Sequence, residues 1–352
     1  AGAGGRGGRG QGAPAEGGAK KDAKGSAFAF MPCSRTKGKA GGARGGEEEE
    51  AEEGAAGGSS SSSGAAAVKK GVDGYDLPDT FEAMVVFNAR MTGANEAVAD
   101  IILKHFDGLV ERVAAGGDAH VELEANIMAV KMHGSVKGQA RLDQFRLCML
   151  ASLRSLLPQL WSSELEHAWS MFWALVEGKL QVGLPMPGKY AAPVARLIDD
   201  APMPEKRALA MRAFQRLFKQ IPDTENYFKQ NNERLISIVV RALEMTSELY
   251  QDPARMIDAV HSLGLRHIMF NVPTAYFEPF SLCIMVELEA MDYPIVAVDG
   301  IAWALTLISS IMVRTIDEGA TPLVRAVLAN SPKQVKKALA EYPRQGRAAA
   351  VL

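Results

Sequence analysis

Histidine is the residue type in this sequence best suited to hold a metal or transfer a proton, because its imidazole titrates at about pH 6.5. Six histidines occur, and His267 lies in the apolar segment LGLRHIMF. Without further pattern, a lone histidine of this kind indicates a core or surface residue rather than a ligand. His105, His120 and His167 lie on polar helix faces, which favours solvated side chains.

The cysteines and the standard catalytic motifs give no second chemistry. Cys33, Cys148 and Cys283 are too few and too scattered for a disulfide framework or a metal site, so a reducing compartment is expected. Cys148 and Cys283 occupy mainly apolar segments, where a thiol packs as a small hydrophobe. The sequence has no P-loop, no H-E-x-x-H and no G-x-S-x-G, so no hydrolytic enzyme is indicated.

The N-terminal fifth of the chain has a different composition from the rest. Of 34 glycines, 20 fall within the first 71 positions, and residues 1–72 carry almost no aliphatic bulk. Such a segment cannot bury enough apolar surface to offset the entropy of ordering, so it is predicted to be a disordered low-complexity tail. Its GGRGGRGQG run is similar to RNA-binding repeats, but EEEEAEE and a net charge of −2 argue against a nucleic-acid partner.

The remaining sequence predicts an all-α fold. Apolar residues recur at three- and four-residue spacing, as in Ile236, Val239, Val240 and Leu243. We expect one domain at 73–185, another at 190–320, and a basic C-terminal helix and tail at 321–352. The longest apolar run, Ile301–Val313, is too short to span a bilayer and predicts a buried core helix rather than a membrane span.

The two halves share anchors in the same order, which predicts a tandem duplication. Leu77–Thr80 matches Ile221–Thr224, and Glu96 matches Glu233. Phe-x-Leu-Cys occurs at 145–148 and 280–283, and Ala-Trp at 168–169 and 302–303. The separations of these pairs fall only from 144 to 137, 135 and 134, so the matches lie on one diagonal.

The second copy resembles the globin family. In that family helix B carries Phe-x-x-x-Phe, a proline opens helix C, and a phenylalanine six residues later packs on the haem; the matching residues here are Phe214, Phe218, Pro222 and Phe228. The family's Leu-Gly-x-x-His segment, followed by a valine and a phenylalanine, is matched by Leu263, Gly264, His267, Val272 and Phe277. The resemblance covers about Ala192 to Glu318 and implies a globin-like helical fold.

The resemblance also implies a cofactor site. His267 would bind the iron of haem b as the proximal ligand, since a neutral imidazole on an apolar helix face supplies the axial nitrogen. Phe228 would stack on the porphyrin. The other expected pocket residues are Phe214, Leu235, Val239, Val272 and Phe277.

Two departures from the family pattern limit these expectations. Leu235 falls at the position opposite the proximal histidine and cannot donate a hydrogen bond, although Gln230, Asn231 and Asn232 remain alternatives because the register is open by several residues. In the first copy, Lys131 falls where His267 stands, with His133 as the alternative ligand. This copy matches only from Leu77, so helices A and B are predicted to be absent, and haem is expected in the second domain only.

The leading functional hypothesis is a haem-binding globin-like protein that binds a diatomic gas, oxygen or nitric oxide. Any steady gas chemistry would need an external reductase, and we expect no enzymatic activity of its own. The alternative is a haem-free helical scaffold or interaction module built from degenerate globin copies. A cytoplasmic location is expected, with organelle targeting left open because the chain begins at Ala1; the oligomeric state is open.

Overall fold

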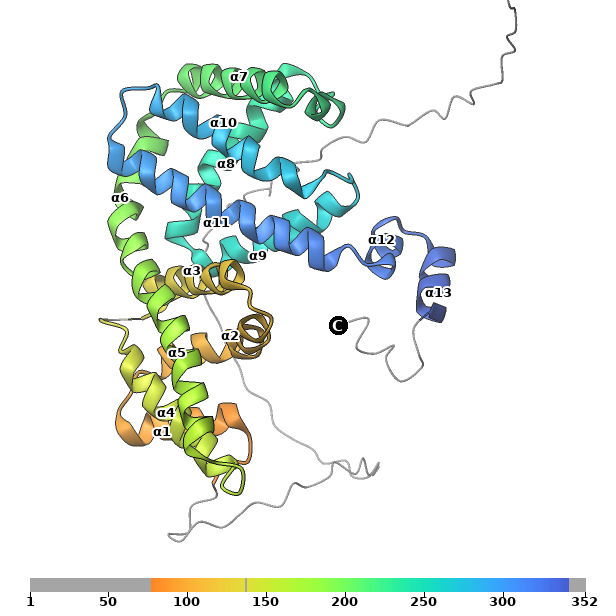
Figure 1. Ribbon diagram of the computed structural model, residues 1–352. Helices are drawn as coiled ribbons and strands as arrows, with labels where there is room; N and C mark the ends of the chain where they lie inside the picture. The colour runs from red at the N-terminus through yellow and green to blue at the C-terminus, as the bar shows by residue number, and fades with distance from the viewer. Residues whose placement is uncertain (1–76, 137, 342–352) are drawn as a thin grey trace, which may run out of the picture.

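The computed structural model describes residues 77–136 and 138–341, and within these ranges the protein is built of helices without a strand. This confirms the predicted all-α class. The helices form two units joined end to end (Figure 1). The first unit comprises α1 (Phe81–Thr92), α2 (Glu96–Ala114), α3 (Asp118–Ser135), α4 (Leu142–Leu156) and α5 (Ser163–Gly183). The predicted tail, 1–72, lies outside the described residues.

The second unit carries the segment with the globin-like motifs. It comprises α6 (Pro185–Asp200), α7 (Met203–Gln220), the 3₁₀ helix η1 (Pro222–Asn226), α8 (Asn232–Gln251), α9 (Pro253–Ile268), the 3₁₀ helix η2 (Thr274–Tyr276), α10 (Phe277–Glu289) and α11 (Ile295–Gly319). Helix α11 packs against α6, α8, α9 and α10, and α7 packs against α8 and α10. Pro222 opens η1, as the sequence pattern predicts for a short helix at this point.

Capping side chains fix where several helices begin. Asn95 accepts hydrogen bonds from the backbone amides of Ala97 and Val98 at the start of α2. Asn231 accepts one from Arg234 at the start of α8, and Asp252 accepts one from Arg255 at the start of α9. Each cap satisfies an amide that has no partner inside its helix, so these polar residues set the register of the apolar faces that follow.

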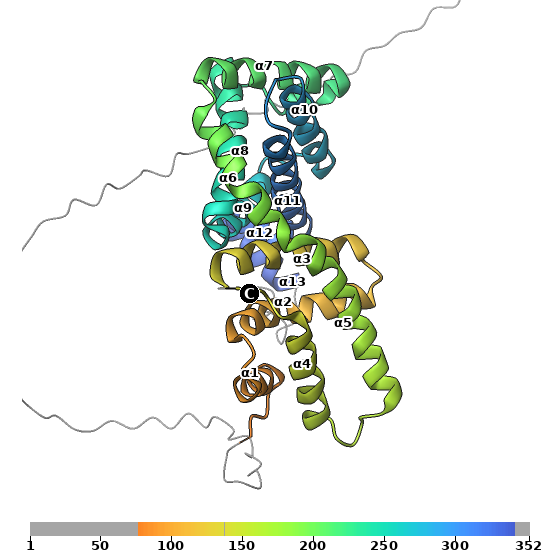
Figure 2. The same ribbon diagram turned by 90° about the vertical axis from the view of Figure 1, so that its left-hand side faces the viewer.

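Helix α3 belongs to both hydrophobic cores. One face contributes Val121, Ala125, Met128 and Met132 to the core of the first unit. The other face contributes Leu123, Ile127 and Val130 to the core of the second unit. Both views place α3 at the junction of the two units (Figures 1 and 2). The units are therefore packed on one shared helix.

The described part of the first unit begins with a helix. Helix α1 begins at Phe81 after the Thr80 cap and packs against α4, as α7 packs against α10. The Leu77–Thr80 anchor is thus followed by a full helix, whereas Ile221–Thr224 runs into the short helix η1, and the absence of helices A and B from this unit stays a prediction. A counterpart of α6 is not found among the described residues of this unit.

The C-terminal part contains one long apolar helix and a small helical pair. Helix α11 spans 25 residues, more than the apolar run in the sequence, and by length and composition alone it could cross a membrane. However, 56% of its most hydrophobic window is buried among other helices, as in the core helix of a globular protein. Beyond it, α12 (Pro322–Leu328) and α13 (Pro332–Glu341) pack against each other.

Candidate functional site

An apolar cavity of about 80 Å³ lies inside the second unit, between α8, α9, α10 and α11. Within a wider hollow of about 720 Å³ that includes its mouth, the wall contains one histidine, two serines and one tyrosine among apolar side chains. The lining comprises Phe228, Ile238, Ala242, Met245, Leu263, His267, Val272, Tyr276, Phe277, Phe280, Ser281, Leu305, Ile308, Ser309 and Met312. Such a wall excludes water from any group bound against it.

His267 is the only nitrogen base in this wall. Its side chain lies at the end of α9, and the residue is 6% exposed. Nδ1 lies 2.8 Å from the carbonyl oxygen of Leu263, so Nδ1 carries the proton and donates it, which leaves the lone pair on Nε2. Burial lowers the pKa of His267, against a smaller opposite effect of the Leu263 hydrogen bond. The imidazole is therefore held neutral, in the tautomer that binds metals through Nε2.

Aromatic rings surround His267 and the mouth of the cavity. The His267 ring contacts Phe277 edge-on, with centroids 5.8 Å apart, and Phe270 at 6.0 Å. Elsewhere in the lining, Phe228 lies nearly parallel to Phe280, with centroids 6.3 Å apart and an angle of 18°. These rings restrict the rotation of the imidazole and offer flat apolar faces to a planar ligand.

The side chains of α8 that face the cavity differ from those expected. Ile238, Ala242 and Met245 line it, whereas Leu235 and Val239 are buried but lie outside the lining. The difference has its origin in the Asn231 cap, which sets the first turn of α8 and brings positions 238, 242 and 245 to one face. The cavity side of α8 still carries no hydrogen-bond donor in its side chains.

Most of the other predicted site residues line the cavity. His267, Phe228, Val272 and Phe277 line the cavity, while Phe214 lies behind Phe228 at a ring distance of 5.0 Å and lies outside the lining. Of the polar alternatives, Asn231 is used as the α8 cap. Gln230 does not line the cavity, although its buried Oε1 has no hydrogen-bond partner.

Sequence reasoning did not identify the wall that α11 provides. Leu305, Ile308, Ser309 and Met312 follow the three- and four-residue spacing of one helix face. That spacing was present in the sequence but is shared by ordinary core helices, so it could not identify a cavity. The Oγ atoms of Ser281 and Ser309 lie 2.8 Å apart and hydrogen-bond to each other.

The first unit differs from the second at two positions that matter for the cavity. It has Lys131, not a histidine, at the position that the sequence alignment pairs with His267. The eleventh residue after the cap is Phe106 in α2, counted from Asn95, and the cavity-lining Ala242 in α8, counted from Asn231. Aligning the two helices through Glu96 and Glu233 instead shifts this pairing by one residue. Phe106 is 5% exposed and packs on Phe81, Trp169 and Phe172. Lys131 is half-buried, and His133 is exposed at the end of α3. A bulky ring thus stands where the second unit has a methyl group.

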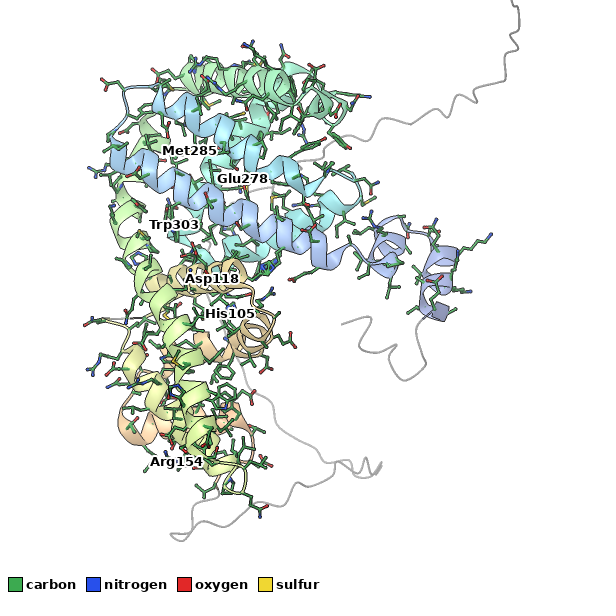
Figure 3. All side chains as sticks on the ribbon, in the orientation of Figure 1. His105, Asp118, Arg154, Glu278, Met285 and Trp303 are labelled. Atoms are coloured by element: carbon green, nitrogen blue, oxygen red, sulfur yellow. The ribbon has the colours of Figure 1, made fainter. Side chains whose placement is uncertain are left out.

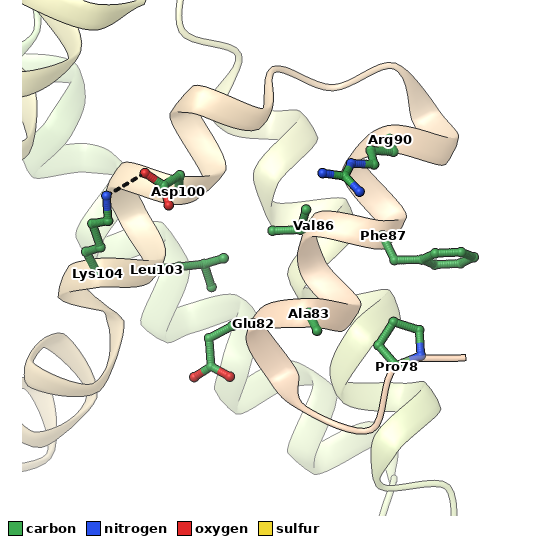
Figure 4. Close-up of a pocket in the computed structure, with 9 residues that line it drawn as sticks. All are labelled: Pro78, Glu82, Ala83, Val86, Phe87, Arg90, Asp100, Leu103 and Lys104. Carbon is green, nitrogen blue, oxygen red and sulfur yellow. Dashed lines mark hydrogen bonds and ion pairs between the residues drawn. The ribbon is translucent and has the colours of Figure 1, made fainter. Parts of the chain in front are cut away.

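A second hollow, of about 590 Å³, lies on the surface of the first unit between α1 and α2 (Figure 4). Its apolar floor includes Val86 and Leu103, and Glu82 and Arg90 lie among its charged lining residues, while Asp100 and Lys104 pair with each other at 2.7 Å. This hollow is an open groove with a mixed lining of apolar and charged side chains. Among the described residues, no cluster of three or more His, Cys, Asp or Glu side chains could hold a bare metal ion.

The comparisons with known proteins agree with the position of the cavity. The family model described as Globin matches residues 211–293, a range that begins in α7 and ends after α10. His267 and most of the cavity wall lie within that range. No curated protein matches the sequence.

Proposed function

We propose that the cavity binds haem b through His267 and takes a diatomic gas, oxygen or nitric oxide, as its ligand, since residues 211–293 match the Globin family model. The observation that supports this proposal most strongly is His267 itself. It is a buried, neutral imidazole on an apolar wall, with Nδ1 bound to the Leu263 carbonyl. A hydrogen bond on the distant ring nitrogen is the usual means of orienting a metal-binding histidine.

The donor set of the cavity fits haem. When bound, haem would supply an iron able to take a gas molecule, and the protein supplies the axial nitrogen, the flat aromatic contacts and the exclusion of water. Phe228 and Phe280 provide faces for a planar ring, and Phe277 limits rotation of the imidazole. The apolar wall protects the ferrous state by keeping water out.

The wall that α8 contributes to the cavity, which we call the gas side, favours weak retention of oxygen. Ile238, Ala242 and Met245 offer no proton to a polar ligand, and the two serine hydroxyls of the wall bond each other. A neutral hydrogen bond contributes about 1 kcal/mol, and its absence is expected to raise the dissociation rate of oxygen. This property suits transient oxygen or nitric oxide binding, with electrons from an external reductase if gas chemistry is catalysed.

The first unit is proposed to bind no haem. Phe106 occupies the position that corresponds to Ala242, and the core around it is filled by aromatic rings. Burial lowers the pKa of Lys131, but its ammonium Nζ already donates to His105 Nε2 at 3.2 Å. His133 is exposed at the end of α3.

A visible spectrum tests the proposal. The full chain supplied with haem should show a Soret band that is lost in His267→Ala and retained in the control His133→Ala, because only His267 lines the cavity. A wild-type protein without a Soret band would overturn the haem proposal.

A haem-free scaffold is the alternative function, and one observation favours it. The enclosed space of about 80 Å³ is below the range of roughly 300–1,000 Å³ that is usual for small-molecule sites. The cavity would therefore have to widen for haem to bind. The absence of a Soret band, with the helical fold intact by circular dichroism, would support this alternative.

A further inference from the structure

The junction between the two units contains a buried group of charged side chains. Glu124 of α3 is 5% exposed and accepts a hydrogen bond from Arg314 of α11. It also lies 2.7 Å from His105 Nδ1 and 3.7 Å from Arg112 Nε, both on α2. Although burial alone would raise it, the pKa of Glu124 is lowered, because His105, Arg314 and Arg112 together outweigh that effect. We call Glu124, His105, Arg112, Lys131 and Arg314 the Glu124 cluster.

His105 belongs to this cluster and is not the solvated residue that the sequence indicates. Its Nδ1 faces Glu124, and its Nε2 receives the Lys131 ammonium. Figure 3 labels His105 on α2, below the second unit. The cluster lies on α2, α3 and α11, and each of these helices contributes a basic side chain. Glu124 is the buried anion between them, and Glu318 pairs with Arg112 at 3.1 Å from the more exposed side.

The residue after Arg314 contacts the helix that carries His267. Thr315 Oγ1 lies 2.8 Å from Nδ1 of His261 on α9. One turn further along α9, a Cβ added to Gly264 would lie only 2.9 Å from Thr315 Cβ. Helices α11 and α9 are therefore closely packed at this point. A movement of α11 is expected to move α9.

From Gly264 the remaining step to the imidazole is short. The preceding residue, Leu263, holds His267 Nδ1 through its carbonyl oxygen at 2.8 Å. A continuous series of contacts thus runs from Glu124 through Arg314 and Thr315 to α9 and His267. Helix α3 also packs directly on α9, and Asp258 of α9 interacts electrostatically with Lys131 of the Glu124 cluster, so the cluster lies against α9 as well as against α11.

We propose that Glu124 is a positioning residue through which the first unit fixes α9, and hence His267, and so regulates the ligand site of the second unit. This inference rests on the proposed function for its consequence at iron, but its structural content is the position of α9. The first unit thereby acts as a built-in regulatory unit: whatever loosens its packing on α11 changes the strength of the bond that His267 can make.

Amide hydrogen exchange on the full chain without haem tests the structural step. In Glu124→Gln, the amides of α9 should exchange roughly tenfold faster, because Arg314 loses its anion and α11 is released. Glu122→Gln is the matched control, since Glu122 is exposed on the same helix and pairs only with Lys179 in the described contacts. Equal exchange of α9 in the two variants would overturn the proposal.

A second variant covers the case in which Glu124→Gln fails to fold. Thr315→Val keeps every charge and nearly the same volume but removes the hydrogen bond to His261. It should also speed exchange in α9, and the double variant Glu124→Gln/Thr315→Val should exchange no faster than the more affected single variant. Additive effects would show two independent contacts and would contradict the series.

The haem-loaded protein supplies a spectroscopic readout. The iron–histidine stretching band of the ferrous protein should shift in Glu124→Gln and Thr315→Val and stay in place in Glu122→Gln. An unshifted band in both variants would overturn the regulatory proposal even if the Soret band is present. A wild-type chain without a Soret band would sink the proposed function alone, since exchange in α9 still decides whether Glu124 positions that helix.

Discussion

The two helical units have a similar order of helices, but the second unit contains a cavity and the first has a filled core. In the second unit, Ala242 and Leu305 leave a cavity against which His267 is held neutral. In the first, Phe106 and the rings of Trp169 and Phe172 fill the core. The comparison shows that a similar order of helices does not by itself make a cavity. One difference lies at a single helix position, where the first unit has Phe106 and the second has Ala242.

Removing the ring from the first unit should have the largest effect. Phe106→Ala is expected to lower the free energy of unfolding by about 3–5 kcal/mol, because it leaves a void in a packed core. Urea denaturation measures this, with the exposed Leu147→Ala as control, expected within about 0.5 kcal/mol of wild type. A loss below about 1 kcal/mol would mean that the first unit is not a solid core.

Placing a ring in the second unit is the reverse experiment. Ala242→Phe should weaken haem binding roughly a hundredfold, about 2.7 kcal/mol, because the new ring occupies the cavity. Haem transfer to a competing acceptor gives the affinity. Ser237→Phe adds the same ring on the exposed side of α8 and should leave the affinity unchanged. Unaltered binding in Ala242→Phe would refute the position of the cavity.

A smaller change sharpens the account of the gas side. Ile238→Gln introduces an amide donor on the cavity face of α8, so oxygen should dissociate about tenfold more slowly, which corresponds to one hydrogen bond. Ile238→Leu keeps the wall apolar and should retain the wild-type rate in stopped-flow measurements. If both variants release oxygen at the same rate, Ile238 does not face the ligand.

The smallest effect concerns pH and the junction of the units. Burial lowers the pKa of His261, and the nearby Arg314 and Lys131 add to this against the opposite effects of Asp258 and Glu124. A histidine whose folded pKa is below its unfolded value of about 6.5 contributes stability above that pH and loses it as the pH falls through the folded value. The full chain should therefore become less stable from about pH 6.5 downward.

His261→Gln isolates this contribution, since glutamine has no titration in that range and can still bond Thr315. Thermal unfolding between pH 7.5 and 5 should show a shallower decline for the variant than for wild type. Parallel curves would show that His261 does not take part in the stability of the junction.

Much of this architecture could be predicted from the sequence. Helical periodicity and proline positions indicate the all-α class, and the spacing from Phe214 to Phe277 points to the globin-like segment and to His267. The register of α8 could not be predicted, because it depends on whether Asn231 or a neighbour caps the helix. Nor could the Glu124 cluster, since its contacts join separate helices: His105 meets Glu124 across α2 and α3, and Arg314 reaches Glu124 only where α11 packs on α3.

The position of α3 has a consequence for how this protein can be divided. Leu123, Ile127 and Val130 complete the second core from outside the family match, so a fragment starting at Pro185 would leave an apolar surface of the second unit exposed to water. Heating should accordingly melt the two halves together. The limits of the family match therefore differ from the limits of a fragment that could fold on its own.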